Sequence, residues 1–320
     1  MCLTKLYKSP INYTGNKYRL LEQYKKYFPK EVNNFVDLFT GGATVSINLK
    51  AKRIVAIDNN KYVINLLNYL KKQDYDIIIS KIEKMIEKYN LSNSYKYGYS
   101  HYKEYVKGNN GLKKYNEIGY NMLKNDFNKL KNKNTDKANL MLYLLMIYGF
   151  NNDMRFNARG EFNLPTGKTD MNKNNRIKLK EYIEVCKTKN IEFVKSDYQK
   201  VNTSYLGIDD FVYADPPYLI TDAVYNETSG WNEKNEEELL RYLDELNNKK
   251  IKFALSNVLE KEERENIILK NWIKKNNYFI YDIQYHYRSS SYNKKNRNGK
   301  EREVLITNYK MEEINETKHK

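Results

Sequence analysis

The sequence predicts an α/β fold with a mostly parallel sheet, an antiparallel last strand and an inserted helical subdomain. Short runs of β-branched and aromatic residues alternate with helical patterns, which is typical of parallel sheets crossed by helices. A long interval without such runs separates the second run from the third. With 320 residues, the chain is long enough for one large domain or for a core domain that carries an insertion.

The predicted strands are bounded by turn-forming residues. They cover residues 34–39, 52–58, 191–196, 210–214, 251–256, 278–287 and 303–309. Helical patterns at Glu236–Leu246 and Glu260–Lys275 separate several of these runs. The last two runs are joined by a polar segment without a helix, so we expect them to pair as an antiparallel hairpin that closes one edge of the sheet.

The interval from Asp74 to Lys180 is dense in Lys, Asn and Tyr and contains an apolar helical stretch at Ala138–Tyr148. We interpret residues 74–180 as an inserted, largely helical subdomain that contacts a large substrate, with a purely structural insertion as the alternative. On this interpretation residues 1–73 and 181–310 form the core domain, and residues 311–320 form a charged, frayed tail.

The composition favours a nucleic-acid partner. The chain has 56 Lys and Arg against 40 Asp and Glu, a formal net charge of +16, and such a field attracts polyanions. A bias toward Lys, Asn, Ile and Tyr from AT-rich coding would produce the same charge. Cys2 and Cys186 suggest neither a disulfide framework nor a metal cluster, and no apolar run reaches the roughly 18 residues of a membrane span. We expect a soluble, cytoplasmic protein.

A glycine turn follows the first predicted strand in Asp37-Leu-Phe-Thr-Gly-Gly-Ala, before a helix expected to begin near Thr44. Glycines at a strand-to-helix turn let the backbone approach a ligand closely. Asp58 ends the second predicted strand, where a carboxylate can bind a ribose diol or, alternatively, cap the next helix. The pair suits a nucleoside cofactor, but the absence of G-x-G-x-x-G argues against a dinucleotide.

The strongest signal is Tyr213-Ala-Asp215-Pro216-Pro217-Tyr218, directly after an apolar run. The chain has only five prolines, and two of them are adjacent here. Because proline fixes φ and cannot donate to a strand ladder, the pair stiffens a loop at the carboxyl end of a strand. A purely structural Asp-Pro-Pro turn is the alternative.

A rigid acidic loop of this kind suits methyl transfer to the exocyclic amino nitrogen of adenine. This nitrogen is a poor nucleophile because its lone pair delocalises into the ring. Hydrogen bonds accepted by Asp215 and by the Pro216 carbonyl would draw it toward tetrahedral geometry, for in-line attack on a sulfonium methyl. Tyr218 would supply a ring for the base, which has to flip out of the duplex to reach the loop. This chemistry requires no metal.

Together these motifs resemble the Dam family of DNA adenine-N6 methyltransferases, of the D12 class, and its phage-type members in particular. The matching features are Tyr13-Thr-Gly-Asn-Lys17, the DLFTGGA turn, Asp58, the stretch 150–168 and the DPPY motif. The resemblance covers most of the chain. It implies a Rossmann-like methyltransferase sheet, S-adenosylmethionine as methyl donor, and residues 74–180 as a target-recognition domain for double-stranded DNA.

The resemblance also implies a set of cofactor-binding residues. They are Tyr13 and Lys17 in a lid, Asp37, Phe39 and Gly41 around the pocket, Asp58 on the ribose, Asp197 and Tyr198 near the adenine of the cofactor, Asp215 in the catalytic motif, and Tyr225 near cofactor and target base.

Family members carry a DNA-entering β-hairpin in the segment that matches residues 150–168. Arg155 and Asn157 fall on its base-reading positions and Pro165 on an apolar contact, so the resemblance implies an Arg155 hydrogen bond to a guanine edge. From the residues alone, Ala158-Arg-Gly160 is a turn between short polar strands, and its arginines could contact only phosphates.

Two positions depart from the family pattern. Asp153 replaces an apolar residue that flanks the recognised bases, and Thr169 stands where some phage members place a second base-reading arginine. These changes leave the chemistry intact, but they weaken the inference that this chain shares the GATC recognition sequence of the family. GATC stays the leading recognition sequence. Near the end of the chain, the loop with Ser290 and Arg297 resembles a family segment along the DNA backbone, and a solvated charged hairpin is the alternative.

Several readings compete with this one. A methyltransferase for cytosine N4 or for RNA uses the same chemistry, although cytosine enzymes of this kind usually have Ser where Asp215 stands. The remaining alternatives are a catalytically silent DNA-binding relative and a nicotinamide-dependent oxidoreductase. The partners expected are DNA and a cognate restriction endonuclease, and we expect a monomer or a weak dimer on DNA in a bacterial or phage-infected cell.

Overall fold

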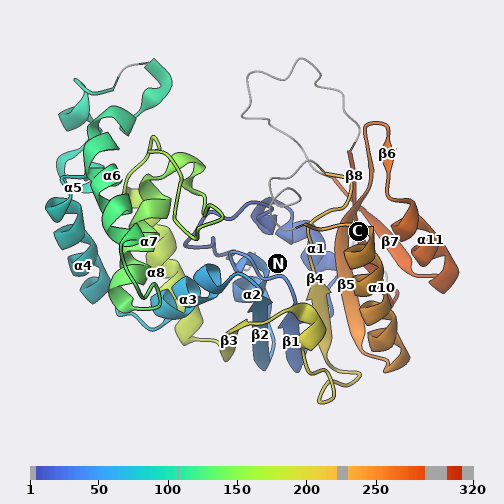
Figure 1. Ribbon diagram of the computed structural model, residues 1–320. Helices are drawn as coiled ribbons and strands as arrows, with labels where there is room; N and C mark the ends of the chain where they lie inside the picture. Colours follow the sequence, from blue (N-terminus) through green and yellow to red (C-terminus); the bar gives the residue numbers. More distant parts are fainter. Residues whose placement is uncertain (1–4, 107, 222–229, 285–300, 312–320) are drawn as a thin grey trace, which may run out of the picture. The chain divides into compact units, whose positions relative to one another are not determined.

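The computed structural model describes residues 5–106, 108–221, 230–284 and 301–311 (Figure 1). The chain forms two compact units, and each of them draws on several chain segments. Unit 1 consists of residues 1–18, 40–49 and 58–195, and unit 2 of residues 19–39, 50–57 and 196–320. The predicted insertion 74–180 lies wholly inside unit 1.

Unit 2 is built on a twisted sheet. Its strands lie side by side in the order β2 (Arg53–Asp58), β1 (Asn34–Asp37), β4 (Phe211–Ala214), β5 (Lys252–Lys261), β8 (Glu301–Thr307) and β7 (Phe279–Ile283), and β6 (Arg264–Glu265) pairs with the end of β5. The first four strands are mutually parallel, and β8 is antiparallel to both β5 and β7. The mostly parallel sheet with an antiparallel last strand is therefore confirmed.

Alternate residues of β4 show how the sheet of unit 2 is covered on both faces. Val212 belongs to the core cluster with Leu239 and Leu243 of α10 (Glu233–Asn248), whose Asn232 and Asn235 form a capping box. Tyr213 points to the opposite face, where its ring lies 6.3 Å from that of Tyr24 in α1 (Leu21–Tyr27). Burial on both faces explains why the strand sequences are nearly continuous apolar runs.

One predicted element was wrong. The sequence pattern predicts a helix from Glu260, but β5 continues to Lys261, β6 follows, and α11 begins only at Ile267 and ends at Asn276. The charged residues 260–265 are acceptable in a helix, yet the long β8 extends its antiparallel ladder as far as the Lys261–Glu301 pair. Pairing with a distant strand overrides local helix propensity here, and the side chain of Asn266 then caps α11 by accepting the Leu269 N–H.

Unit 1 is mainly helical. It contains α2 (Thr44–Asn48), α3 (Lys61–Lys71), α4 (Tyr75–Lys88), α5 (Ser94–Tyr97), α6 (Lys113–Asn128), α7 (Asp136–Tyr148), α8 (Lys173–Lys187) and the strand β3 (Ile191–Lys195). Short 3₁₀ turns cover Lys17–Arg19, Tyr99–Tyr102, Gly108–Asn110 and Phe150–Asn152. A further 3₁₀ turn, Tyr198–Lys200, belongs to unit 2. Every residue from Ala138 to Tyr148 is buried, so α7 is the central helix of the unit, as its apolar sequence indicates.

The segment after α7 forms the hairpin that the sequence predicts, here called the 149–168 hairpin. Antiparallel bridges join Gly149 to Thr166 and Phe156 to Phe162. A Cβ on Gly167 would lie 2.1 Å from the Gly149 carbonyl oxygen, so only glycine fits where the two strands meet. The hairpin is thus held in a fixed shape at its base.

Candidate functional site

The predicted catalytic loop begins directly after β4, and its carboxylate is held from two sides. Oδ1 of Asp215 accepts a hydrogen bond from Ser256 Oγ on β5 at 2.7 Å and one from the Tyr218 hydroxyl at 2.9 Å. Ser256 in turn lies 3.0 Å from the Tyr213 hydroxyl, in the core of the sheet. Parallel pairing of β4 with β5 therefore positions Asp215 through a serine that its own strand does not contain.

A second carboxylate reaches the same loop. The Tyr218 hydroxyl shares its single proton between Asp215 and Glu303 Oε1 on β8, which lies at 3.2 Å, and Glu303 accepts a further hydrogen bond from the Tyr24 hydroxyl at 2.7 Å. Burial raises the pKa of Tyr218 well above its usual range, and the nearby Asp215 carboxylate adds to the effect. The phenol stays protonated, so it can only donate to these carboxylates and cannot serve as a base.

The proline pair sits between these anchored residues. Pro216 is buried and Pro217 is partly exposed. Beyond them, the Thr221 N–H and hydroxyl both donate to the Tyr218 carbonyl, at 3.2 and 3.0 Å. The loop from Asp215 to Thr221 is therefore closed at both ends, which leaves the carboxylate and the Tyr218 ring in one geometry.

An aromatic cluster in unit 2 contains two of the predicted cofactor residues. The ring centroids of Phe39 and Tyr198 lie 5.2 Å apart, and the Trp231 ring meets Phe39 edge-on at 5.9 Å. Asp197 accepts the Gln199 N–H at 3.0 Å and so caps the short turn that carries Tyr198. Trp231 was missed in the sequence, because a lone tryptophan before a helix carries no signal of its partners.

The carboxylate at the end of β2 is oriented by the glycine turn. In unit 1, Oδ2 of Asp58 accepts the Gly41 N–H at 2.9 Å and Oδ1 accepts the Asn60 N–H at 2.8 Å. Burial raises the pKa of Asp58 from its usual value, and these two N–H groups oppose the increase. The N-cap of α3 is Asn60, whose side chain accepts the N–H groups of Tyr62 and Val63. Asp58 is therefore not the cap, and the alternative role considered from the sequence was wrong.

The glycine turn also receives the predicted lid segment. Gly41 has φ +46°, and a Cβ there would lie 2.8 Å from a Tyr13 ring carbon. Lys17 is only 7% exposed, and its Nζ donates to the Gly15 carbonyl at 3.2 Å. In unit 1 the structure thus brings Tyr13, Gly41 and Asp58 together. Asp37, at the end of β1 in unit 2, is 1% exposed.

The 149–168 hairpin presents Arg155 at its surface. Its Nε donates to Asn163 Oδ1 at 2.9 Å and its Nη2 to the Asn163 carbonyl at 3.2 Å, so the exposed guanidinium is held across the hairpin. Asn157 has a local role, because its Oδ1 accepts the N–H groups of Arg159 and Glu161 and shapes the turn. Pro165 is exposed on the returning strand.

The two departures from the family pattern have different surroundings. Asp153 accepts a hydrogen bond from the Thr14 hydroxyl at 3.5 Å, and burial raises the pKa of its carboxyl. The Thr169 hydroxyl donates to the Ile147 carbonyl at 2.9 Å and is thereby directed inward.

Three predicted site residues, Tyr225, Ser290 and Arg297, lie outside the described residues. Within the described ranges no three His, Cys, Asp or Glu side chains are grouped as metal ligands. No helix in those ranges is both long and apolar enough to cross a membrane.

The sheet of unit 2, with an anchored acidic turn after β4, defines an α/β protein with a mostly parallel sheet. The family model for the D12 class N6 adenine-specific DNA methyltransferase matches residues 13–296. The chain belongs to this family, and the resemblance drawn from its motifs is confirmed.

Characterised relatives agree with this assignment. The chain is 40% identical to the Type II methyltransferase M.FokI of Planomicrobium okeanokoites over 94% of its own length and 43% of that protein. It is 35% identical to the modification methylase StsI of Streptococcus sanguinis, over 98% of the chain and 44% of the relative. The DNA adenine methylase of Escherichia coli strain K12 is 28% identical over 68% of each chain. The chain therefore spans less than half the length of the first two relatives.

Proposed function

We propose that this protein transfers a methyl group from S-adenosylmethionine to N6 of an adenine flipped out of duplex DNA. The observation that carries the proposal is the Asp215 carboxylate, held by Ser256 and Tyr218 at the start of the proline-stiffened loop. Membership of an adenine-specific family over residues 13–296 supports adenine over cytosine as the target base.

The proposed chemistry uses the geometry of the loop. Asp215 and the Pro216 carbonyl would accept hydrogen bonds from the adenine amino group and localise its lone pair. Because Ser256 and Tyr218 already fix Oδ1 of Asp215, the carboxylate requires no reorganisation when positive charge develops on the nitrogen. Asp215 would also accept the proton that the methylated amino group releases. When bound, S-adenosylmethionine would supply the electrophilic methyl group on its sulfonium.

Two groups of the expected residues, each taken by itself, suit a part of a nucleoside. In unit 1, Asp58 is oriented by two N–H groups while its charge is partly desolvated, which suits hydrogen bonds from a ribose diol. In unit 2, Phe39 and Tyr198 form an aromatic pair that suits an adenine ring. We propose these contacts together with the remaining expected residues, which are Tyr13, Lys17, Asp37, Gly41, Asp197 and Tyr225.

For target recognition we propose Arg155 as the base-reading residue and GATC as the sequence to test first. Asn163 holds the guanidinium with two hydrogen bonds, and a fixed guanidinium plane favours bidentate contact with a guanine edge. Asn157 and Pro165 would contribute neighbouring contacts, and Ser290 and Arg297 contacts to the DNA backbone. A cognate restriction endonuclease and action in the cytoplasm are part of the same proposal.

The test is methyl transfer from labelled S-adenosylmethionine to unmodified duplex DNA, with RNA as a second substrate. Nucleoside analysis by mass spectrometry should find N6-methyladenine in DNA, and sequencing of the modified DNA should locate it. N4-methylcytosine, or label in RNA alone, would favour one of the rival methyltransferases. Specific DNA binding without any transfer would identify a silent relative.

A further inference from the structure

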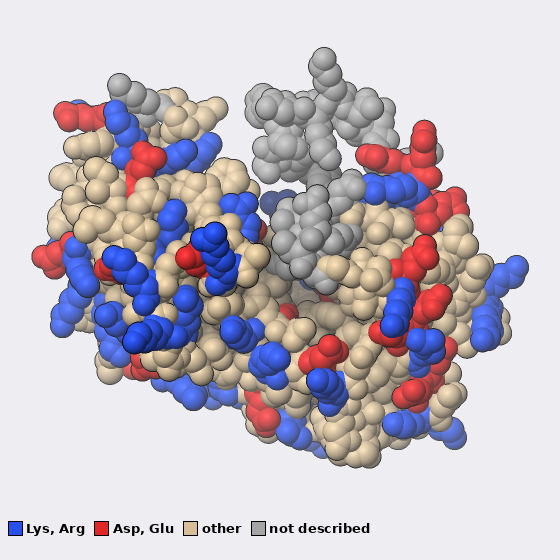
Figure 2. Space-filling model, viewed as in Figure 1, with Lys and Arg blue, Asp and Glu red and all other residues tan. Residues whose placement is uncertain are grey.

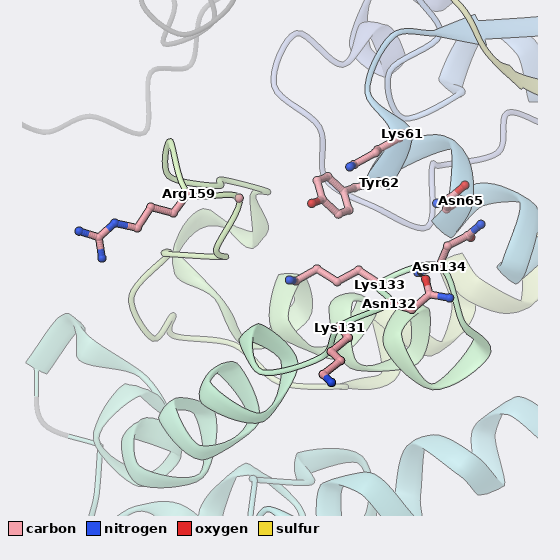
Figure 3. A pocket seen from close by; sticks show the side chains of 9 residues that line it. Lys61, Tyr62, Asn65, Lys131, Asn132, Lys133, Asn134 and Arg159 are labelled. Carbon is pink, nitrogen blue, oxygen red and sulfur yellow. Dashed lines mark hydrogen bonds between the residues drawn. The ribbon is translucent and has the colours of Figure 1, made fainter.

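A cavity in unit 1 lies apart from the residues assigned to the cofactor and to base reading. Its volume is about 420 Å³. It is formed by the first turn of α3, the loop between α6 and α7, and the turn of the 149–168 hairpin, which contribute Lys61, Tyr62, Lys131, Lys133 and Arg159 (Figure 3). Asparagine side chains and Gly160 complete the wall.

The wall of this cavity is suited to an anion. Four of its residues are cationic, and none of the residues that line it carries a carboxylate. In the described part of the chain, none of the four cations forms an ion pair, and Lys133 has only the Leu130 carbonyl at 3.4 Å as a hydrogen-bond partner. Lysine and arginine offer donors alone, and their mutual repulsion is relieved when an anion enters. Over the helices of unit 1, most of the charged side chains on the face that Figure 2 shows are Lys and Arg.

The cavity is preorganised by contacts between its walls. The Tyr62 ring of α3 stacks on Phe156 of the hairpin, with centroids 4.0 Å apart and an interplanar angle of 12°. A Cβ on Gly160 would lie 3.9 Å from the Tyr62 hydroxyl, so the turn approaches the same tyrosine. The hairpin turn is therefore fastened to the helix, and in Figure 3 the Arg159 side chain extends from that turn away from the other labelled side chains.

Two other anion-binding modes do not apply at this cavity. The N–H groups of Tyr62 and Val63 in the first turn of α3 are not available to a ligand, because the Asn60 side chain already accepts them. A stacked base is disfavoured as well, because one face of Tyr62, the only ring in the wall, is covered by Phe156. The remaining recognition chemistry is that of side-chain cations with a phosphate group.

We propose that this cavity binds a backbone phosphodiester of DNA and positions the duplex for the 149–168 hairpin. The proposal rests on the proposed function, because it names duplex DNA as the ligand. The hairpin contributes Arg159 to the cavity wall, four residues from Arg155 in the chain, so we expect a DNA strand read by Arg155 to run close to the cavity. Phosphate contacts set the register of a protein on DNA, whereas base contacts specify sequence.

The proposal is tested with Lys131→Gln/Lys133→Gln, and Lys81→Gln/Lys84→Gln on α4 is the control. Both control lysines are exposed and lie in unit 1, and their substitution removes the same charge as the cavity variant does. Binding of short duplexes is measured by fluorescence anisotropy across a salt series without cofactor. We expect the cavity variant to bind all sequences more weakly and to lower the slope of log K against log salt by about 1 for each lost phosphate contact. The control should retain the wild-type slope.

The other outcomes separate this proposal from the proposed function. If the wild type binds and methylates DNA while the cavity variant keeps the control's slope, the phosphate site is wrong and the function stands. If the variant loses sequence preference instead, the cavity reads bases. If wild-type protein binds inorganic phosphate in calorimetry and the variant does not, yet their DNA binding is equal, the site takes a free phosphate. A wild type that binds no DNA overturns both proposals. Equal melting temperatures exclude misfolding.

Discussion

The Tyr218 hydroxyl donates to Oδ1 of Asp215 at 2.9 Å, so the last residue of the DPPY motif holds the first. The sequence indicated a different use of Tyr218, as a ring for the target base. Both uses are compatible, because the hydrogen bond engages the hydroxyl while the ring remains partly exposed. The motif is therefore an internally braced turn, and the predictions for its residues differ accordingly.

Replacing the carboxylate of the loop should remove catalysis. We expect Asp215→Ala to abolish methyl transfer, since the acceptor for the adenine amino group is lost, while DNA binding without cofactor survives. Transfer of labelled methyl and anisotropy with a duplex measure the two properties. Retained transfer would remove Asp215 from the proposed role.

The brace can be tested separately from the ring. Tyr218→Phe keeps the ring and removes the donor to Asp215 and Glu303. A hydrogen bond to a charged group contributes about 1.5–3 kcal/mol, so we expect kcat to fall roughly 10- to 100-fold with little change in the KM for DNA. Tyr218→Ala should lose more, because the ring is removed too. Equal kcat values for wild type and Tyr218→Phe would show that the brace is unimportant.

The glycine turn should tolerate no side chain. At Gly41 a Cβ meets the Tyr13 ring at 2.8 Å and φ is +46°, so Gly41→Ala should displace Tyr13 and weaken S-adenosylmethionine binding in calorimetry. Gly207→Ala is the matched control, since a Cβ there meets nothing within 4 Å. If both variants bind cofactor as the wild type does, the Tyr13 contact with the turn does not shape the cofactor site.

The hairpin offers a pair of arginines with different expected roles. Arg155→Ala should cost about 1–3 kcal/mol of discrimination against wrong bases at one position of the target. Arg159→Ala, at the turn, should weaken binding uniformly across sequences. Methylation rates on single-base variants of the recognition site distinguish these results. A uniform loss for Arg155→Ala would identify it as a phosphate contact.

A buried glutamate makes stability dependent on pH. Glu236 is 0% exposed. Its Oε2 accepts the Trp231 indole N–H, and its Oε1 accepts the amides of Asn257 and Asn266, all at 2.9 Å. Neither asparagine can turn its amide around, because their Oδ1 atoms accept the N–H groups of Val258 and Leu269. In Glu236→Gln an amide N–H therefore faces another donor, and we expect a loss of roughly 1–3 kcal/mol in urea unfolding at neutral pH.

The pH dependence of the same glutamate has a defined sign. Burial raises the pKa of Glu236 in the folded protein, despite the opposing hydrogen bonds. Its contribution to stability is therefore complete below the unfolded pKa of about 4.3 and is lost as pH rises through the folded pKa. The difference in the free energy of unfolding between wild type and Glu236→Gln should therefore shrink as the pH rises through that window. The exposed control Glu237→Gln should show no such trend.

The sequence by itself determined where most strands lie along the chain, the antiparallel end of the sheet, the buried helix α7 and the acidic proline loop. These features depend on local patterns: a strand buried on both faces is a continuous apolar run, and an adjacent proline pair has few conformations. Membership of the adenine methyltransferase family also followed from such motifs.

Only the tertiary structure decided which groups brace the loop and where α11 begins. Ser256 lies 41 residues from Asp215 in the chain, and Tyr24 lies 279 residues from Glu303. Glu260 and Lys261 became strand because β8 pairs with them, and Arg264–Glu265 became strand because β5 pairs with them after a turn. Hydrogen bonds between distant segments form only after the sheet has brought the segments together, so no local sequence pattern predicts them.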